Sequence, residues 1–517
     1  MLYLAIIFHM HQPYYKNLLT HETAAPWVRL HGTKDYLDMV KMLEKFPAIN
    51  LTFNFVPSLI EQVLDYANGQ IKDQWLELSY KPAAQLSAED KRFILERFFS
   101  ISRDNVICRS PRYFQLILKK EQNQEFNTQD FLDLQVWFNL SWIDPYFRKE
   151  RPQLKAIVDK GRFYTEKEKK AVLDAQIGIL KEIMPYYKKI VSNHQVEFTF
   201  TPFYHPILPL LYNTNIAREV NLRATLPNVQ FSYPQDAKAQ IQAAVDFFKE
   251  KFGFTAAGMW PSEEAVSEHV IPFMIQSGIN WIVCDEGILF KSLKKKKRDT
   301  RLLYQPHVLK RKDGTLNVVF RDRNLSDLIG FTYYHLSAKD AVNNFMEHLK
   351  NINQSFNQQD ILVTVAMDGE NAWEYYLNDG HDFLEQLYQR LSESDFVKTI
   401  TVKDYLASHP PKNQIRRISA GSWIYTDFFK WINNPFKNKA WEYLAQARKG
   451  LDDSKLQLDD AKRKLAYRQI YIAEGSDWFW WYGEKNRDFD SLFRMHLRNF
   501  YTLIEKEPPT YLNTPLE

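Results

Sequence analysis

Residues 361–366 read Ile361-Leu362-Val363-Thr364-Val365-Ala366, a near-continuous apolar run that leads into Met367-Asp368-Gly369. Such a run predicts a parallel β-strand that is covered on both faces. Similar runs occur earlier in the chain, at residues 4–8, 51–55, 196–200, 255–260, 281–285 and 318–322. Amphipathic helical stretches separate most of them, as a βα-repeat requires. We therefore predict an α/β fold, an incomplete (β/α)7 barrel with one strand fewer than the usual eight.

Two regions depart from this repeat. Residues 60–195 form a long helix-rich insertion, in which Ser87-Ala88-Glu89-Asp90 is typical of a helix start. Beyond residue 405 helical stretches dominate, among them Lys455–Ile472. We predict a barrel domain at 1–405 and a C-terminal helical region at 406–517 that contributes aromatic residues to the cleft. The cluster Trp478-Phe479-Trp480-Trp481-Tyr482 is expected to pack against the barrel, because so many exposed aromatic rings would promote aggregation.

The composition and net charge limit the classes of binding partner that the sequence predicts. The 517 residues carry a net charge of +4, too small a bias to predict a nucleic-acid or membrane partner. The basic run 294–298 has no interleaved aromatic residues, so we interpret it as a solvated loop. The apolar start of the chain is too short to span a membrane and lacks signal-peptide features. With two distant cysteines, Cys108 and Cys284, these features predict a cytoplasmic protein.

Two strand ends carry carboxyl groups. In barrel enzymes the reacting groups lie at the C-terminal ends of the strands. Glu263 follows the strand at 255–260, and Asp368 follows the strand at 361–366. Two carboxyl groups flanking one bond are what retaining glycoside hydrolysis needs, and the 15% aromatic content suits a sugar site. Helix capping by Glu263 or Glu264 and a turn role for Asp368 remain alternatives at this point.

The first strand ends in histidines. Alternation along a strand directs His9 and His11 to the same side, toward the mouth of the barrel. A His-x-His pair in this place also begins the metal site of amidohydrolases, which His205 and Asp368 could complete. A metal-dependent hydrolase that uses His9 and His11 is therefore an alternative from another class. The aromatic residues around each candidate ligand favour a sugar cleft instead.

Four motifs carry a family resemblance. They are His11-Gln12-Pro13, Pro202-Phe203-Tyr204-His205-Pro206, Trp260-Pro261-Ser262-Glu263 and Asp368-Gly369-Glu370-Asn371. At these motifs the chain resembles glycoside hydrolase family 57, which includes amylases, amylopullulanases and 4-α-glucanotransferases. Further family-like stretches are 26–31, 133–139 and 476–481. The resemblance implies a (β/α)7 barrel, with Glu263 as nucleophile and Asp368 as general acid/base.

These observations together predict a retaining hydrolase of α-1,4-linked glucans, similar to an amylase or amylopullulanase. A 4-α-glucanotransferase of the same family is the alternative. Catalysis by two carboxyl groups roughly 5–5.5 Å apart requires neither cofactor nor metal. Glu264, outside the motif position, is expected to start a helix or to stand behind the nucleophile. The other expected substrate-binding residues are His9, His11, His205, Tyr204, Trp260, Trp373, Trp423 and Trp478. Arg29, Asp285 and Asp322 are weaker candidates, for which salt-bridge or turn roles fit equally well.

Overall fold

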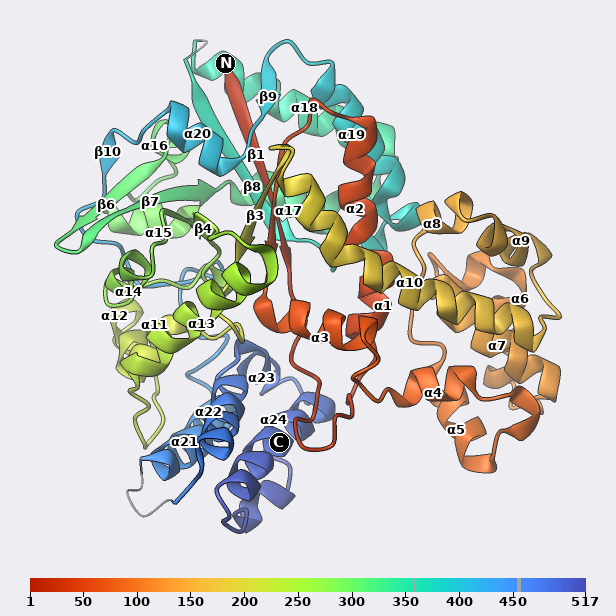
Figure 1. Cartoon of the computed structure of the whole chain (residues 1–517). Coiled ribbons are helices and arrows are strands. Elements are labelled where there is room, and N and C mark those ends of the chain that lie inside the picture. The colour runs from red at the N-terminus through yellow and green to blue at the C-terminus, as the bar shows by residue number, and fades with distance from the viewer. Residues whose placement is uncertain (358, 453–456) are drawn as a thin grey trace.

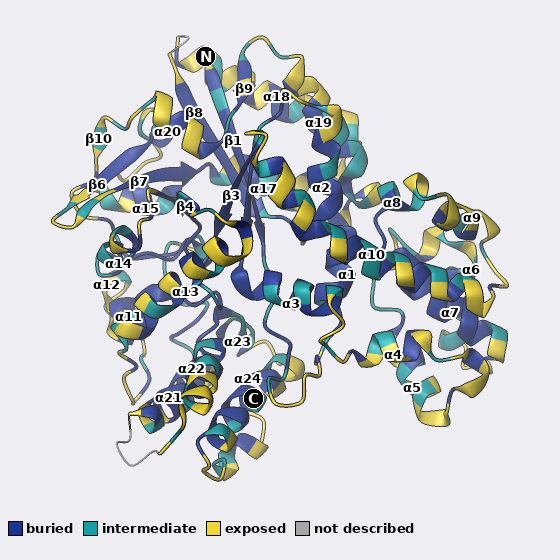
Figure 2. Cartoon of the chain, viewed as in Figure 1, coloured by how far each residue is buried: buried dark blue, intermediate teal, exposed yellow. Residues whose placement is uncertain are grey.

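The computed structural model describes residues 1–357, 359–452 and 457–517 (Figure 1). In this part of the chain, seven parallel strands pair in the order β1-β2-β3-β4-β5-β7-β8, and β8 pairs again with β1. The (β/α)7 barrel is therefore confirmed. The strands are β1 (Leu2–Met10), β2 (Leu51–Phe55), β3 (Val196–Phe200), β4 (Gly258–Met259), β5 (Trp281–Asp285), β7 (Gly314–Arg321) and β8 (Ile361–Asp368). Each coincides with one of the predicted apolar runs, and the strands are buried on both faces (Figure 2).

Three short strands were not predicted. β6 (His307–Arg311) pairs antiparallel with β7, β9 (Val397–Thr399) pairs with β1, and β10 (Asn413–Gln414) pairs with β6. The β6–β7 connection contains Asp313-Gly314, a typical hairpin signal that could have revealed this pair. These strands extend the sheet outside the closed barrel and do not change its strand order.

Helices surround the barrel. Those that follow or precede its strands are α1 (Trp27–Lys34), α2 (Leu37–Lys41), α11 (Leu208–Tyr212), α12 (Ala217–Val220), α13 (Pro234–Phe252), α14 (Ile271–Gln276), α15 (Glu286–Ser292), α16 (Thr300–Leu303), α17 (Arg323–Asp327), α18 (Ala338–Ser355), α19 (His381–Ser392) and α20 (Val402–Ser408). Among the described residues, none of the helices has both the length and the apolar character needed to cross a bilayer.

The long insertion between β2 and β3 is helical. Its helices are α3 (Pro57–Ala67), α4 (Gln74–Tyr80), α5 (Ala88–Arg97), α6 (Pro111–Glu121), α7 (Thr128–Ser141), α8 (Pro145–Glu150), α9 (Pro152–Lys160) and α10 (Glu166–Val191). Helix α5 begins with a capping box formed by Ser87 and Asp90, at the helix start that the sequence predicted. Figure 1 shows α4 to α9 as a lobe beside the barrel, which the long helix α10 joins back to β3.

The chain after the barrel is also mainly helical, with α21 (Pro435–Leu451), α22 (Asp460–Ala473), α23 (Ser476–Trp481) and α24 (Arg487–Leu503). Helix α22 covers most of the helix predicted at 455–472, although residues 455 and 456 lie outside the described residues. Two isolated β-bridges tie this region to the barrel loops: Pro206 to Gly475, and Val266 to Gly421. The first bridge reaches the loop after β3 and the second reaches the loop after β4.

Candidate active site

Glu263 lies in a tight turn just after β4. Its φ is 57° and that of Glu264 is 51°, so two consecutive non-glycine residues adopt the left-handed conformation. Such conformations cost energy and are concentrated at functional sites. Trp423, from the chain beyond the barrel, holds Glu263 at two points. Its backbone N–H donates to the Glu263 carbonyl oxygen (3.0 Å), and its Nε1–H donates to Oε2 (2.7 Å).

Asp368 is the last residue of β8 and faces the same side of the barrel. Its register partner on β1 is His9, whose carbonyl oxygen accepts a hydrogen bond from the Gly369 N–H (2.8 Å). A Cβ on Gly369 would lie 2.2 Å from Met10 Sδ, so any other residue here would require the Met10 side chain to move. Asn371 Nδ2 donates to Asp368 Oδ2 (3.2 Å) and orients it.

Both carboxyl groups have a raised pKa. Burial raises the pKa of Glu263 to about 8, the charge of Asp368 adds to this rise, and the hydrogen bond from Trp423 opposes it. Burial also raises the pKa of Asp368, against the lowering effects of Asn371 and His11. The Glu263 side chain is 12% exposed. The two carboxyl groups therefore interact electrostatically, and protonation of one favours ionisation of the other.

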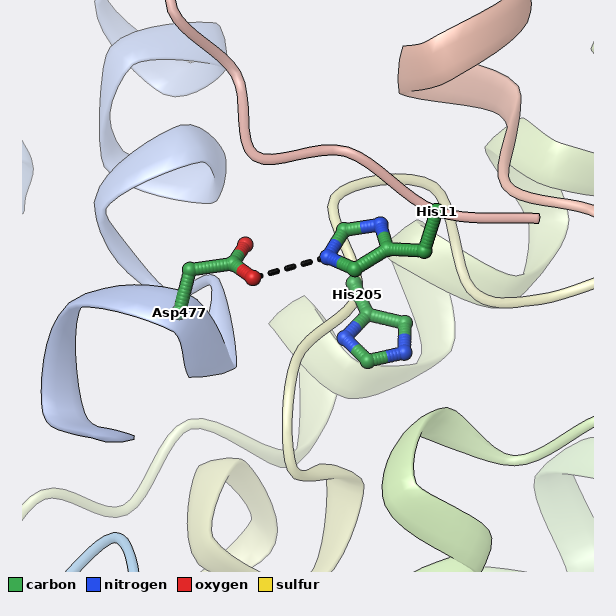
Figure 3. A group of neighbouring side chains, drawn as sticks. All are labelled: His11, His205 and Asp477. Carbon is green, nitrogen blue, oxygen red and sulfur yellow. Dashed lines mark hydrogen bonds and ion pairs between the residues drawn. The ribbon is translucent and has the colours of Figure 1, made fainter. Parts of the chain in front are cut away.

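Three histidines stack beside the acids. The rings of His11 and His205 lie 3.9 Å apart at 19°, and the ring of His9 lies on Trp260 at 4.8 Å. His11 Nε2 hydrogen-bonds to Asp477 Oδ1 (2.8 Å), which comes from α23 (Figure 3). Burial, helped by the charge of His11, lowers the pKa of His9 to about 3, and burial lowers that of His205 well below its usual value. His9 and His205 are therefore neutral at physiological pH.

The group formed by His11, His205 and Asp477 is close enough for a metal, since its ligand atoms all lie within 4.8 Å of one another. This set differs from the predicted one, which combined His9 and Asp368 with the other histidines. The stacked rings of His11 and His205 present their faces to each other, whereas tetrahedral ligation needs nitrogen lone pairs that converge. Both nitrogens of His205 also already have partners, Ser476 and His9. The donor set fits hydrogen bonding to a polar ligand better than a metal.

A cavity of about 680 Å³ opens in front of these groups. It is lined by parts of the barrel, the insertion and the C-terminal region together. Its lining residues include His9, His11, His205, Glu263, Asp368, Glu370 and Asn371 from the barrel, Trp27, His31, Ser100–Ser102 and Trp142 from α1 and the insertion, and Trp423, Asp477, Trp480 and Trp481 from the C-terminal region. A lining that combines carboxyl groups, histidines and indole rings is suited to a hydroxyl-rich ring.

The model of glycosyl hydrolase family 57 matches residues 5–418 of the chain. The chain belongs to this family. Alpha-amylase 1 of Dictyoglomus thermophilum is 22% identical over 272 residues, which cover 51% of this family 57 enzyme and 34% of that protein. The matched segment thus spans about a third of the length of the curated relative.

Two solved structures share the fold of this family 57 enzyme. The GH57-type branching enzyme of Pyrococcus horikoshii has a TM-score of 0.63 at 16% identity, over 97% of this chain and 89% of that chain. The alpha-amylase AmyC of Thermotoga maritima has a TM-score of 0.62 at 13% identity, over 97% of this chain and 93% of that chain. At such low sequence identities, the similarity to these two structures shows a shared fold alone.

Four aromatic residues expected to stack on sugars do not line the cavity of the family 57 enzyme. Trp260, Trp373 and Trp478 are each 1% exposed, and Tyr204 is 7% exposed. Trp373 Nε1 donates to the Gly369 carbonyl oxygen (2.7 Å) and so supports the loop of Asp368. Neighbouring rings pack against them: His9 against Trp260, Phe8 and Tyr376 against Trp373, His496 against Trp478, and Tyr14 against Tyr204. Trp423 does line the cavity, as do His9, His11 and His205.

The weaker candidates have structural partners. Arg29 is fully buried and donates to Asp73, Asn139 and Gln176. Asp285 caps α15 at the Gly287 N–H (2.8 Å) and pairs with Arg323. Asp322 caps α17 at the Leu325 N–H (3.0 Å) and pairs with Arg298 (2.8 Å). None of the three lines this cavity.

Glu264 does not start a helix, since the next one, α14, begins at Ile271. Its side chain is fully buried, and neither carboxyl oxygen has a hydrogen-bond partner among the described residues. Burial raises the pKa of its carboxyl group well above the usual value. Glu264 follows Glu263 in the turn but does not line the cavity.

Sequence reasoning missed several lining residues, notably Trp27, Asp477, Trp480 and Trp481. All four lie inside the family-like stretches at 26–31 and 476–481; the C-terminal region was expected to contribute aromatic residues to the cleft, but these residues were not named as its lining. The sequence does not show which of these residues the fold brings to the cavity. Residues 477–481 reach the cavity through the docking of α23 beside the loop of His205, where the Ser476 N–H donates to the His205 carbonyl oxygen (3.0 Å).

Proposed function

We propose that this enzyme is a retaining hydrolase of α-1,4-linked glucans, similar to an amylase, with Glu263 as nucleophile and Asp368 as general acid/base. The observation that carries the proposal is that Glu263 and Asp368, from the loops after β4 and β8, border one cavity rimmed with indole rings. Membership of family 57 supports the same reaction class. The names of its relatives, an amylase and a branching enzyme, support an α-glucan as substrate.

The first step forms a covalent glycosyl-enzyme. The Glu263 carboxylate attacks the anomeric carbon while Asp368 gives its proton to the glycosidic oxygen, so the bond to the leaving sugar breaks with that oxygen neutralised. In the second step Asp368 removes a proton from water, and the resulting hydroxide replaces Glu263 at the anomeric carbon. Two inversions leave the configuration retained.

The environment of the two acids bears on these roles. Burial and the charge of Asp368 raise the pKa of Glu263 to about 8, and burial raises the pKa of Asp368. Glu263 is therefore mostly protonated near neutral pH in the free enzyme, and attack requires that this proton leave it. The Trp423 Nε1–H donates to Glu263 Oε2 and favours the ionised form that attack requires.

Polar and aromatic groups around the acids would hold the sugar. His11 and Asp477, each slightly exposed at the cavity, can exchange hydrogen bonds with the ring hydroxyls. Trp480 and Trp481 are partly exposed at the rim and present indole surface for stacking on neighbouring sugar units. The aromatic rim can also hold an acceptor sugar, and this observation favours glucan transfer as the second candidate function.

Incubation with maltoheptaose, followed by chromatography of the products, tests the proposal. We expect only chains shorter than the substrate, with the α-anomer formed first as seen by proton NMR. Products longer than maltoheptaose would show that the enzyme transfers glucan to another sugar and would contradict the proposed hydrolysis. Initial formation of the β-anomer would contradict the retaining mechanism.

Three variants test the residue roles. Glu263→Gln and Asp368→Asn are expected to lower kcat by about 10³-fold or more, because each removes a group that acts in the transition state. Glu264→Gln is the matched control, since Glu264 is the neighbouring residue and its carboxyl group is buried and does not line the cavity. If Glu264→Gln abolishes activity and Glu263→Gln does not, the assignment of the nucleophile is wrong.

A further inference from the structure

A line of hydrogen bonds runs inside the barrel from β2 to the nucleophile. Asn54 Oδ1 contacts His9 Nδ1 (2.6 Å), and His9 Nε2 contacts His205 Nε2 (3.2 Å). His205 Nδ1 in turn contacts Ser476 Oγ (2.8 Å) and lies 3.9 Å from Glu263 Oε1. Asn54, His9, His205 and Ser476 are all at least 97% buried, so water does not compete for these bonds.

Asn54, at one end of this line, determines which atom donates and which accepts in the first hydrogen bond. Its Nδ2 donates to Thr199 Oγ1 (3.1 Å), and its Oδ1 accepts from the Thr201 hydroxyl (2.9 Å), so the amide oxygen faces His9. An amide oxygen can only accept, so the hydrogen between the two side chains belongs to His9 Nδ1. Because His9 is neutral, its Nε2 then carries no hydrogen.

The same argument determines the tautomer of His205. Its Nε2 faces the bare Nε2 of His9, so a hydrogen bond there requires the hydrogen on His205 Nε2. His205 is also neutral, which leaves its Nδ1 without a hydrogen and able to accept from the Ser476 hydroxyl. The tautomers of both histidines thus follow from one amide oxygen, which the two histidines separate from Glu263.

The tautomer of His205 affects the hydrogen bonds that Glu263 receives. Ser476 has a single hydroxyl hydrogen, and although the hydroxyl is also within reach of Glu263, the bare Nδ1 of His205 takes that hydrogen. Glu263 Oε2 is occupied by the Trp423 Nε1–H. Oε1, which lies 3.9 Å from His205 Nδ1, therefore receives no hydrogen from His205 or from Ser476. The opposite tautomer of His205 would donate to Ser476 Oγ and release the serine hydrogen toward Glu263, which would weaken the carboxylate as a nucleophile.

We propose that Asn54 is a positioning residue that sets the tautomers of His9 and His205 and thereby leaves Oε1 of Glu263 as the attacking oxygen. The inference rests on the proposed function for its catalytic consequence alone. The tautomers themselves are properties of the free enzyme and can be measured without any substrate.

Nitrogen-15 NMR of the intact protein with labelled histidine tests the tautomers. The signals are assigned with His9→Gln and His205→Gln. In the unsubstituted protein we expect the hydrogen on His9 Nδ1 and on His205 Nε2. Asn54→Leu removes the acceptor and is expected to move hydrogen to His205 Nδ1. Thr201→Val, which leaves Asn54 facing His9, and Ser476→Ala, which removes a hydroxyl able to donate or accept, are expected to keep both tautomers.

Kinetics with a maltooligosaccharide test the catalytic consequence. Asn54→Leu is expected to lower kcat about 10- to 100-fold with KM changed less than about twofold, and Thr201→Val is expected to match the unsubstituted enzyme. A His205 hydrogen on Nδ1 in the unsubstituted protein would overturn the inference, even if Asn54→Leu does not fold. A fall in kcat without a tautomer change would also overturn it. Absence of glucan activity in the unsubstituted enzyme would contradict the proposed function but leave the NMR result standing.

Discussion

Trp423 binds Glu263 through both its backbone and its side chain, although 160 residues separate them in the chain. The indole ring is itself held from the other side by Arg321, whose guanidinium lies 5.3 Å from the ring centre. Arg321 is anchored to the barrel by a hydrogen bond to the Ala366 carbonyl oxygen (2.8 Å). The position of Glu263 therefore depends on the chain that follows the barrel as well as on its own loop.

Trp423→Phe is expected to shift the pH dependence of activity. The substitution removes the N–H that donates to Oε2, and a donor lost from a carboxylate raises its pKa. Since attack requires ionised Glu263, the acid limb of the kcat/KM profile should move to higher pH. The loss of a hydrogen bond to a charged group predicts a fall in kcat/KM of about 10- to 100-fold near neutral pH.

The control for this prediction is Trp431→Phe. Trp431 is fully buried, contacts Trp480, and its Nε1 has no hydrogen-bond partner among the described residues. Its replacement should leave the acid limb where it is. An acid limb that stays unchanged in Trp423→Phe would show that the indole N–H does not tune Glu263.

Lys437→Met is expected to weaken substrate binding. The buried ammonium group of Lys437 donates to the carbonyl oxygens of Lys430 (2.6 Å), Phe479 (2.7 Å) and Trp480 (3.1 Å) and so holds the rim of the cavity. Without it these oxygens lose their donor and the Trp480 segment shifts, so KM for maltoheptaose should rise about 5- to 10-fold with little change in kcat. Lys439→Met, on the same helix but at the surface, should behave as the unsubstituted enzyme. Equal KM values in Lys437→Met and Lys439→Met would argue against this role.

Arg29→Met is expected to destabilise the fold. Arg29 is fully buried with its partner Asp73, and it also bonds to Asn139 and Gln176 in the insertion. Removing one partner leaves a buried carboxylate unpaired, which costs about 3–5 kcal/mol of unfolding free energy. Urea unfolding followed by tryptophan fluorescence measures this loss. Arg92→Met, an exposed position in α5, should cost less than about 0.5 kcal/mol.

Glu197→Gln is expected to change the pH dependence of stability. Burial raises the pKa of Glu197 to about 7 in the folded protein, against the usual 4.5. Between these values the folded state binds the extra proton, so stability falls as pH rises through this window, by about 3 kcal/mol in total. Glutamine does not titrate, so Glu197→Gln should gain about 3 kcal/mol relative to the unsubstituted protein between pH 4.5 and pH 8.

Urea midpoints at the two pH values test the Glu197 prediction. Trp281 Nε1 and the Lys403 N–H donate to the Glu197 carboxyl group and can donate to a glutamine oxygen as well, so the substitution should not disturb the packing. A constant difference between the two proteins at both pH values would contradict the raised pKa. Glu347→Gln, at an exposed position, serves as the control.

Much of the barrel could be predicted from local sequence. An apolar run such as 361–366 can only be buried on both faces, and this requirement is a property of the segment itself. The same segment shows that Asp368 follows the strand, and strand ends of a parallel barrel meet at one mouth. The hairpin partner β6 was missed because its residues Lys310 and Arg311 are polar and interrupt the apolar pattern.

The surroundings of the acids could not be predicted in this way. Trp260 and Trp373 sit next to catalytic motifs in sequence, yet their rings are covered, while Trp480 and Trp481 arrive at the rim from the far end of the chain. Sequence distance to a motif says nothing about which face of a ring remains free, because that depends on what packs against it.

The chain's apolar periodicity and its strand-end acids determined the barrel and the choice of Glu263 and Asp368 as candidates. Tertiary structure alone decided which groups touch them. The contact of Trp423 with Glu263 and the line from Asn54 through His9 to His205 join residues from different strands and from the C-terminal region. Hydrophobic periodicity is a local property of each segment, whereas hydrogen-bond direction and burial depend on partners that only the folded chain brings within reach.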